Sequence, residues 1–266
     1  MVLRSVSLPA FNCHSHTVIF LHGRRSNPRD FSWKLWDSRD RRGDSLQHIF
    51  PTVKWVFPEA EDVFAECSQR QVRQWFDISD LSNPEERPEL QAPGLRDVVP
   101  PLIELIRREA SAVGLGNVIL AGISQGGAAA IHTLLNYPKP GSDHECQHGV
   151  SNDDRLCAFI GLSSWMSLGA DSVEASRELL HLEEPAASDR SDAIFRNTPV
   201  FIGHCADDPI VPIEQGRRLR DVLSTYGMTV TWKEYPTGGH WINDPQGIED
   251  IVAFLTSQGL ARAPRA

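Results

Sequence analysis

The chain has 266 residues, 41% of them hydrophobic and 23% charged, and its formal net charge is −9 at pH 7. This is an ordinary globular composition, and the length suits one large domain as well as two small ones. The negative charge argues against a nucleic-acid partner and against strong electrostatic attraction to anionic lipid.

Short apolar runs rich in Val, Ile and Phe recur along the chain, and each ends in small or turn-forming residues. Such runs are typical of strands that are buried on both faces of a sheet. We predict strands at residues 17–21, 53–57, 117–121, 156–160, 199–202 and 230–235. Periodicity between them predicts helices at 97–113, 125–137, 213–226 and 247–257. This alternation predicts an α/β fold with a mostly parallel central sheet and helices on both faces.

Two prolines constrain the first of these helices, because Pro100 and Pro101 lie near its predicted start. A proline ring has no N–H to donate and is tolerated only in the first turn of a helix. We therefore expect this helix to begin near Asp97. It should end at Gly114, a residue suited to the position that follows a helix.

Three segments do not fit the alternation, namely residues 61–93, 138–154 and 164–197, the last with one helix predicted at 172–182. In folds with parallel sheets, substrates bind beyond the carboxyl ends of the strands. We expect the three segments to be loop excursions over this edge of a single domain that spans residues 1–266.

The run Gly-Ile-Ser-Gln-Gly-Gly at residues 122–127 lies between a predicted strand and a predicted helix. This is the pattern of a nucleophile elbow, in which a serine occupies a sharp turn between a strand and a helix. Glycines flank the serine because side chains there would collide with the neighbouring backbone. The pattern in this context predicts that Ser124 is a catalytic nucleophile at the carboxyl edge of the sheet.

A serine nucleophile needs a histidine base and a carboxylate that orients the histidine. His240 follows the strand predicted at 230–235, and Asp207 and Asp208 follow the strand predicted at 199–202. The chain order serine, aspartate, histidine is that of α/β-hydrolases, and all three loops lie at one edge of the sheet. We prefer Asp208 as the acid, because the proline after it favours extended backbone and Asp207 would point to the other side.

Hydrolysis at a serine also needs two N–H groups that stabilise the oxyanion of the intermediate. The loop after the first predicted strand, Phe20-Leu-His-Gly-Arg-Arg-Ser26, can supply one of them. The start of the helix after Ser124 can supply the other, because the first N–H groups of a helix have no internal acceptor. We predict that these donors are the backbone amides of Arg24 and Gln125.

These motifs together resemble the acyl-protein thioesterase and carboxylesterase/phospholipase family of small α/β-hydrolases, over residues 17–255. The resemblance rests on Leu-His-Gly at 21–23, Trp-Phe-Asp at 75–77, the elbow at 122–127, Asp-Pro-Ile-Val-Pro at 208–212 and Gly-His at 239–240. It implies the α/β-hydrolase fold and the hydrolysis of thioesters on acylated cysteines, of lysophospholipids or of simple carboxylic esters. It also supports Asp208 as the acid, because the aspartate before the proline has this role in the family.

One departure from the family pattern concerns the mouth of the site. Arg24 and Arg25 stand where typical members have a glycine-containing loop after His-Gly. A substrate other than an acylated protein, such as an ester of specialised metabolism, is therefore an open alternative.

The sequence thus predicts a serine hydrolase that cleaves the carboxylic ester or thioester bond of a small-molecule or acylated-protein substrate through an acyl-serine intermediate. Two alternatives stay open. A pocket that admits a nucleophile other than water would make the protein an acyltransferase or cyclase with the same triad. A non-catalytic ligand receptor on a hydrolase scaffold usually has a broken triad, whereas the triad is intact in this sequence.

Five apolar residues near predicted strand ends are candidates for an acyl-binding groove, and for each of them packing in the core is an equal alternative. They are Trp75, Trp165, Met166, Ile210 and Trp241.

The five cysteines are odd in number and irregularly spaced, and the N-terminus has no long apolar core typical of a signal peptide. No apolar run is long enough to cross a bilayer, so we expect a reduced cytoplasmic protein without stable membrane insertion. No cofactor or metal is expected, because Asp-His-Glu-Cys-Gln-His at 143–148 lacks a second ligand pair at metal-binding spacing. The sequence leaves the oligomeric state open.

Overall fold

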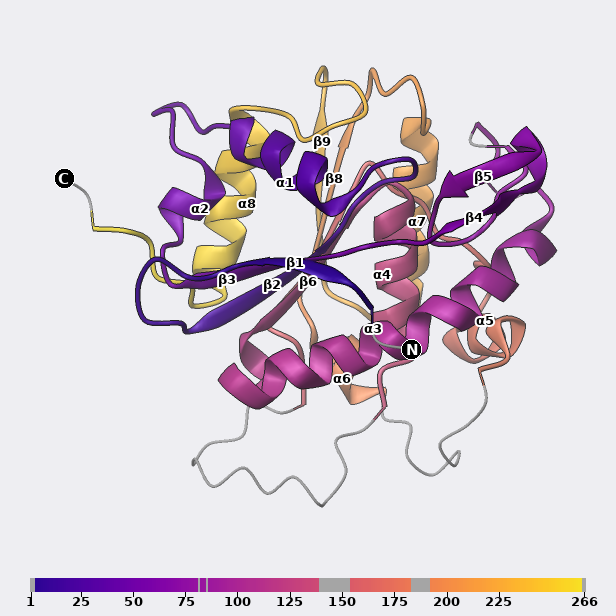
Figure 1. The fold of residues 1–266 in the computed structure, drawn as a ribbon, viewed down its shortest axis with the longest axis horizontal. Coiled ribbons are helices and arrows are strands. Elements are labelled where there is room, and N and C mark those ends of the chain that lie inside the picture. Colours follow the sequence, from indigo (N-terminus) through magenta and orange to yellow (C-terminus); the bar gives the residue numbers. More distant parts are fainter. Residues whose placement is uncertain (1–2, 81, 85, 139–153, 183–191, 265–266) are drawn as a thin grey trace.

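The computed structural model describes residues 3–80, 82–84, 86–138, 154–182 and 192–264. Seven strands form one sheet in the order β1-β3-β2-β6-β7-β8-β9 (Figure 1). Neighbouring strands are parallel except for β1, which pairs antiparallel with β3. The strands of this sheet are β1 (Ser5–Leu8), β2 (His16–Leu21), β3 (Val53–Pro58), β6 (Val118–Ile123), β7 (Ala158–Leu162), β8 (Val200–Cys205) and β9 (Val230–Tyr235). A separate antiparallel hairpin is formed by β4 (Asp62–Ala65) and β5 (Arg70–Arg73).

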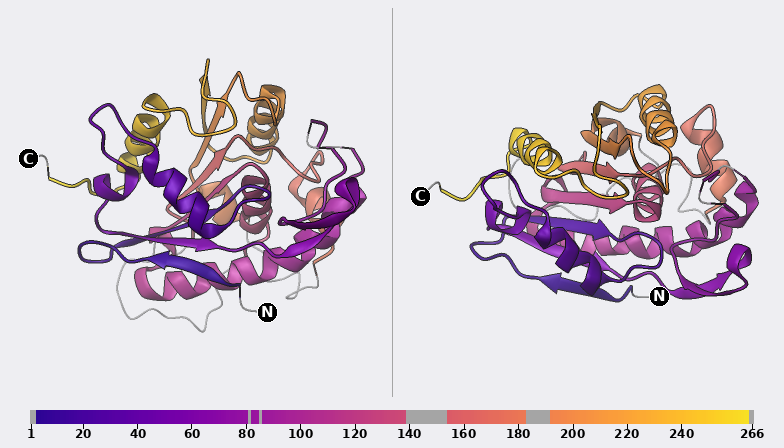
Figure 2. Two further views of the ribbon diagram at one scale, coloured as in Figure 1. Left: turned by 45° about the horizontal axis from the view of Figure 1, so that its top comes forward. Right: turned by 90° about the horizontal axis from the view of Figure 1, so that it is seen from above.

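Helices cover both faces of the sheet (Figure 2). The helices are α1 (Pro28–Asp37), α2 (Leu46–Ile49), α3 (Gln91–Val113), α4 (Gln125–Leu135), α5 (Val173–Leu180), α6 (Ala193–Asn197), α7 (Ile213–Thr225) and α8 (Gln246–Ser257), with short 3-10 turns at Glu66–Ser68, Pro88–Leu90 and Leu115–Asn117. One core packs α3, α4 and α7 against the sheet, and the other packs α1, α2 and α8 against the opposite face. The predicted α/β-hydrolase architecture is therefore confirmed.

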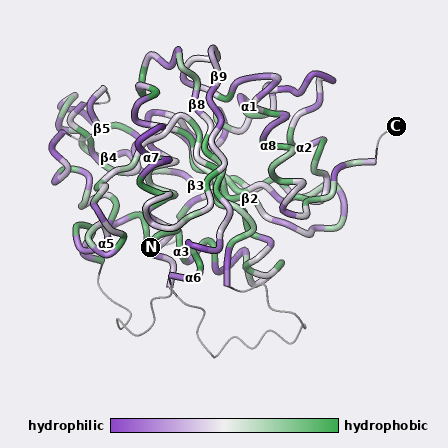
Figure 3. Tube along the Cα trace, turned by 180° about the vertical axis from the view of Figure 1, so that it is seen from behind, coloured by the Kyte–Doolittle hydropathy of each residue, from purple (hydrophilic) through white to green (hydrophobic). Residues whose placement is uncertain are grey.

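Burial explains why the central strands were recognisable. All six residues of β6 are buried, as are all those of β7 and β8, and apart from His204 in β8 their side chains are apolar or absent. Figure 3 shows the hydrophobic colouring gathered on these central strands and the hydrophilic colouring on the outer turns. The edge strand β1 was not predicted, because it has only four residues and no buried one.

The predicted start of the helix at 97 is wrong, since α3 begins at Gln91 and contains Pro100 and Pro101 in its interior. Tertiary packing offsets the backbone hydrogen bonds that the prolines remove, because Leu95 and Leu102 are fully buried on the inner face. The turns of α3 before residue 97 also pack closely against the segment that contains Phe76. A Cβ on Gly94 would lie 2.6 Å from the Cα of Phe76, so only glycine permits this approach.

The part of the segment 164–197 around α5 lies away from the carboxyl edge over which the segment was expected to run, and residues 183–191 lie outside the described residues. Its helix α5 packs beside α3 and the far end of α4, where Arg177 Nε donates to Leu135 O at 2.7 Å and Arg96 Nε donates to Leu180 O at 2.7 Å. The reason is topological: β7 and β8 are parallel neighbours, so the chain must return to the amino edge before β8 starts.

The other two excursions have different outcomes. Residues 62–73 form the β4–β5 hairpin, and its last residue accepts a hydrogen bond from the loop after β2, from Arg25 N to Arg73 O at 2.8 Å. Most of the segment 138–154 lies outside the described residues, as does the run at 143–148. Within the described ranges, no helix is both long and apolar enough to span a membrane.

Candidate active site

Ser124 occupies the sharp turn between β6 and α4. Its backbone has φ 56° and ψ −130°, a conformation that a residue other than glycine adopts only when its surroundings enforce it. Ser124 N donates to Leu162 O at 2.8 Å, and Ser164 Oγ donates to Ser124 O at 2.8 Å. These bonds to the next strand and its loop hold the strained turn in place.

The glycines of the elbow are required by close backbone approach, as the motif predicted. A Cβ on Gly122 would lie 2.4 Å from Gly126 O, and a Cβ on Gly126 would lie 2.4 Å from His22 O. Both contacts are far inside van der Waals distance, and backbone atoms cannot move aside cheaply. The elbow can therefore form only with glycine at both positions.

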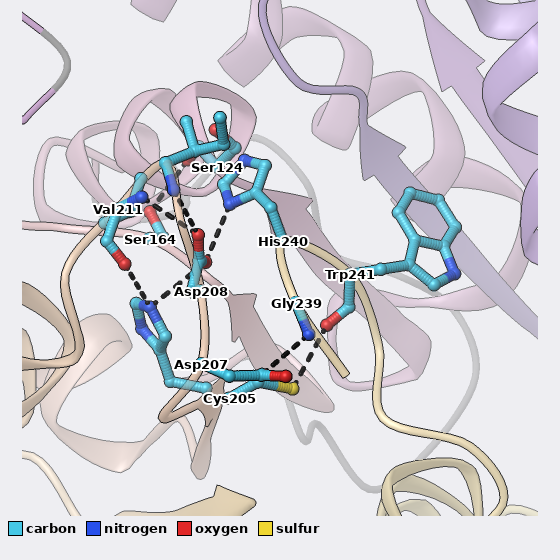
Figure 4. Close-up of polar contacts among 11 residues, drawn as sticks. Ser124, Ser164, Cys205, Asp207, Asp208, Val211, Gly239, His240 and Trp241 are labelled. Atoms are coloured by element: carbon cyan, nitrogen blue, oxygen red, sulfur yellow. Dashed lines mark hydrogen bonds and ion pairs between the residues drawn. The ribbon is translucent and has the colours of Figure 1, made fainter. Parts of the chain in front are cut away.

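Asp208 is the carboxylate that reaches His240, as Figure 4 shows. Its Oδ2 accepts a hydrogen bond from His240 Nδ1 at 2.7 Å, and its Oδ1 accepts from the amides of Ile210 and Val211 at 2.8 and 3.0 Å. Burial by itself would raise the pKa of Asp208. Hydrogen bonds from His204, His240 and the Val211 amide outweigh burial and hold the pKa well below its ordinary value. Asp208 is thus a stable anion.

Asp207 has a different set of contacts. It is exposed, and its carboxylate accepts hydrogen bonds from the amides of Gly238 and Gly239 at 3.3 and 2.8 Å. Asp207 thereby fixes the turn that precedes His240. Asp208 thus binds the imidazole of His240, whereas Asp207 binds the backbone of the loop that carries His240.

His240 follows β9 and Ser124 follows β6, so both lie at the carboxyl edge of the sheet, and Figure 4 draws them together with Asp208. Because a carboxylate oxygen only accepts hydrogen bonds, the contact with Asp208 requires the proton to be on Nδ1. In the neutral imidazole, the other ring nitrogen, Nε2, is then free of a proton and can accept one. This is the tautomer that a general base needs.

A second histidine on Asp208 was missed from the sequence. His204, at the end of β8, is fully buried, and its Nε2 lies 3.3 Å from Asp208 Oδ2 and 2.9 Å from Val211 O. Both partners are acceptors, so Nε2 carries the proton. On the far side of the ring, a Cβ on Gly216 would lie 2.3 Å from His204 Nδ1, so α7 needs glycine there. The sequence signal that could have revealed His204 was its position at the end of a predicted strand, four residues before Asp208.

The loop after β2 lies directly against Ser124. A Cβ on Gly23 would stand 3.4 Å from Ser124 Cβ and 3.9 Å from its Oγ, so the loop that carries the Arg24 amide passes over the serine. His22 anchors the loop, because its Nδ1 contacts Gly23 O at 2.8 Å and its Nε2 accepts from Ala60 N at 3.2 Å. The Gln125 amide, the second predicted donor, belongs to the first turn of α4.

The Trp-Phe-Asp segment holds the elbow and this loop together. Gln125 Oε1 accepts from Trp75 N at 3.0 Å, and its Nε2 donates to Phe76 O at 2.7 Å. Trp75 Nε1 in turn donates to His22 O at 2.8 Å. The side chain of Arg24 joins the same segment, since its Nε donates to Gln74 Oε1 at 2.7 Å. The motif therefore acts as a scaffold for both predicted oxyanion donors.

The five apolar candidates do not form one trough. Trp75, Trp165 and Met166 are buried in the core on the α3 side of the sheet. Trp241 packs on the core of the opposite side, with its ring edge against Phe31. For these four residues the structure shows the core-packing alternative, in two groups on opposite faces of the sheet. Ile210, at 41% exposure, remains available to a ligand.

The described residues contain no group of three or more His, Cys, Asp or Glu side chains placed to hold a metal ion. His204 and His240 both direct a ring N–H at the same oxygen of Asp208, so this group is joined by hydrogen bonds.

An α/β sheet with a nucleophile elbow and a buried aspartate bound to a histidine at its carboxyl edge defines a hydrolase of the ester-cleaving type. The chain belongs to the phospholipase/carboxylesterase family, whose model matches residues 8–143 and 180–258.

Individual relatives agree with this family. The chain is 28% identical to acyl-protein thioesterase 1 of Gibberella zeae over 255 residues, which cover 94% of this chain and 93% of the relative. It is 26% identical to acyl-protein thioesterase 1 of Cryptococcus neoformans over 271 residues, covering 95% and 96% of the two chains. The fold is similar to that of acyl-protein thioesterase 2 of Zea mays, with a TM-score of 0.68, 21% identity and coverage of 96% and 98%.

Proposed function

We propose that the protein hydrolyses carboxylic esters or thioesters of acyl substrates through an acyl-serine intermediate formed on Ser124. The observation that carries the proposal is the 2.7 Å hydrogen bond between His240 and Asp208, at the edge of the sheet where the strained elbow holds Ser124 (Figure 4). This arrangement supports His240 as the general base and Asp208 as the acid that sets its tautomer.

The reaction follows from these positions in two steps. His240 Nε2 takes the proton of the Ser124 hydroxyl while the serine oxygen attacks the carbonyl carbon, and the amides of Arg24 and Gln125 hold the oxyanion. The protonated histidine then gives its proton to the leaving alcohol or thiol, and an acyl-serine remains. Water activated by His240 releases the acid and restores the serine.

His204 is a positioning residue in this proposal. Its Nε2 proton binds the carboxylate oxygen that also binds His240, so it limits rotation of Asp208 about its side-chain bonds. Together with the amides of Ile210 and Val211, it keeps the carboxylate ionised without touching the substrate.

The curated relatives support the thioester branch of the proposal, because the two fungal proteins described above are named acyl-protein thioesterases. An acylated protein is therefore the first substrate class to test, and simple esters the second. A cytoplasmic location is part of the same proposal. It is supported by the described cysteines, Cys13, Cys67, Cys157 and Cys205, which are free thiols.

The test compares Ser124→Ala with wild type on a p-nitrophenyl ester and on an acylated-cysteine peptide. We expect the variant to fold and to lose roughly 10³-fold or more in kcat, because the triad acts as a unit. A fluorophosphonate probe should label wild type at Ser124 and leave the variant unlabelled. The matched control is Ser111→Ala, an exposed serine on α3 whose hydroxyl binds only its own helix. Equal turnover of Ser124→Ala and wild type would refute the proposal.

A further inference from the structure

A basic pocket lies between the loop after β2 and the β4–β5 hairpin. It has a volume of about 260 Å³, and its walls include Arg25, Ser26, Asn27, Asp62, Arg70 and Arg73. Three arginines and one aspartate give it an excess of positive charge. This local sign is opposite to that of the whole chain, whose net charge is −9.

The three arginines differ in their partners. Arg73 is neutralised, since it binds Glu59 at 2.7 Å and Asp62 at 2.9 Å. The guanidinium groups of Arg25 and Arg70 are exposed and make no hydrogen bond or ion pair with any residue that the structure describes. Two cations are therefore available to a ligand. Arginine suits this role, because its planar fork binds carboxylates and phosphates with two parallel hydrogen bonds.

The pocket is joined to the candidate active site through backbone. Arg25 is two residues beyond Gly23. A Cβ on Gly23 would lie 3.4 Å from Ser124 Cβ, so this loop contacts the serine. Arg25 N donates to Arg73 O at 2.8 Å, which fastens this loop to the hairpin seen beside it in Figure 1. Arg25 has φ 65°, a strained conformation that this bond helps to hold. The pocket therefore lies against the same loop that contacts Ser124 at Gly23.

We propose that this pocket is a substrate subsite for an anionic group, a carboxylate or phosphate that the ester carries a few atoms from its scissile bond. Arg25 and Arg70 bind the anion, and Arg73 keeps the hairpin in place through Glu59 and Asp62. The inference rests on the proposed function and adds the substrate class. The preferred substrates are acidic esters or thioesters, in which the charge belongs either to the acyl group or to the alcohol.

The test measures the ratio of kcat/KM for an acidic ester to kcat/KM for its neutral match. On the acyl side, the p-nitrophenyl monoester of hexanedioic acid is compared with p-nitrophenyl hexanoate. On the alcohol side, the hexanoyl ester of glycolic acid is compared with propyl hexanoate. We expect wild type to prefer the acidic member in one arm, and that arm shows which side of the ester carries the anion.

Removal of either cation should reduce that preference. Arg25→Gln and Arg70→Gln should each lower the ratio by up to about fivefold, the upper end of the range of an exposed charge pair, and the double variant should lower it further. The control is Arg42→Gln, which makes the same charge change at an exposed arginine outside this pocket and should leave the ratio unaltered. In wild type, about 0.5 M NaCl should reduce the ratio by screening, which needs no variant to fold.

The outcomes separate the two proposals. A wild-type enzyme that hydrolyses both neutral esters, with no salt-sensitive preference in either arm, overturns the anionic subsite and leaves the proposed function standing. A ratio that Arg42→Gln lowers as much as Arg70→Gln does also overturns the subsite, because general charge then explains it. Wild type that is no more active than Ser124→Ala on every ester overturns both.

Discussion

At the scale of single residues, the neighbouring carboxylates Asp207 and Asp208 should differ sharply in their effect on turnover. Asp208→Asn removes the anion that accepts from His240 Nδ1, so the histidine loses the tautomer it needs. We expect a loss of about 10⁴-fold in kcat, as in triads where the acid sets the tautomer. Asp207→Asn keeps an oxygen that can accept from the amides of Gly238 and Gly239, and should lose far less. Steady-state kinetics decides, and the reverse ranking would move the acid role to Asp207.

His204 should act through Asp208 and not through the substrate. His204→Leu removes the Nε2 donor to the carboxylate, so we expect kcat to fall about tenfold while KM changes little, since about 1.4 kcal/mol of orientation is lost. His204→Gln keeps an N–H donor at a similar place and should recover most of the activity. A loss that is equal in the two variants, or that appears in KM alone, would contradict a positioning role.

At the scale of elements, the joint between the elbow and the loop after β2 depends on Gly126. In Gly126→Ala the new Cβ would lie 2.4 Å from His22 O and 2.6 Å from Leu21 O, so the loop that carries the Arg24 amide must move. We expect a loss of about 1–3 kcal/mol in the free energy of unfolding, together with a fall in kcat. Denaturant titration and steady-state kinetics provide the measurement.

The matched control is Gly247→Ala in α8, where the new Cβ would approach no atom closer than 3.3 Å. Its free energy of unfolding should change by less than about 1 kcal/mol, because a helical alanine is favoured over glycine. If the two variants were equally stable, the close approach at Gly126 would not be what holds the elbow against the loop after β2.

At the scale of the whole molecule, stability should fall with acid over a window set by buried histidines. Burial lowers the pKa of His22 to about 4 and that of His132, on α4, to about 4 as well, so both are neutral in the folded protein. The unfolded chain binds protons at these side chains below its ordinary histidine pKa of about 6.5. The free energy of unfolding therefore decreases as pH falls from about 6.5 to 4, by up to roughly 3 kcal/mol for each histidine.

His132→Gln tests this window. His132 Nε2 contacts Ser167 O at 2.6 Å, and glutamine can donate to the same oxygen without titrating. Denaturant unfolding at a series of pH values should show a shallower fall in stability for the variant than for wild type between pH 6.5 and 4. Parallel curves across this range would exclude His132 as a source of the acid sensitivity.

The low pKa of Asp208 acts at still lower pH. A carboxylate whose pKa is depressed in the folded state contributes stability above its ordinary pKa and loses it as pH falls through the folded value. The Asp208 contribution is therefore lost progressively below about pH 5, so that most of its loss falls beneath the histidine window. The two effects overlap only near the lower end of that window.

Local patterns in the sequence were sufficient to predict the central strands of the sheet and the nucleophile elbow. β6, β7 and β8 were predictable because they are buried on both faces and, apart from His204 at the end of β8, have apolar or glycine residues throughout. The glycines around Ser124 were predictable because the turn excludes any side chain there. The family resemblance drawn from these motifs was confirmed by the match to the phospholipase/carboxylesterase family.

Contacts between distant segments were decided only by the tertiary structure. The burial of Leu95 and Leu102 let α3 continue through two prolines that local rules would place at its start. The faces of the sheet separated Trp241 from Trp75, although both lie near strand ends in the sequence. The second histidine on Asp208 and the place of Arg70 beside Arg25 in one pocket also escaped prediction. Each depends on side chains from different loops meeting within a few ångströms, a distance that no periodicity along one chain encodes.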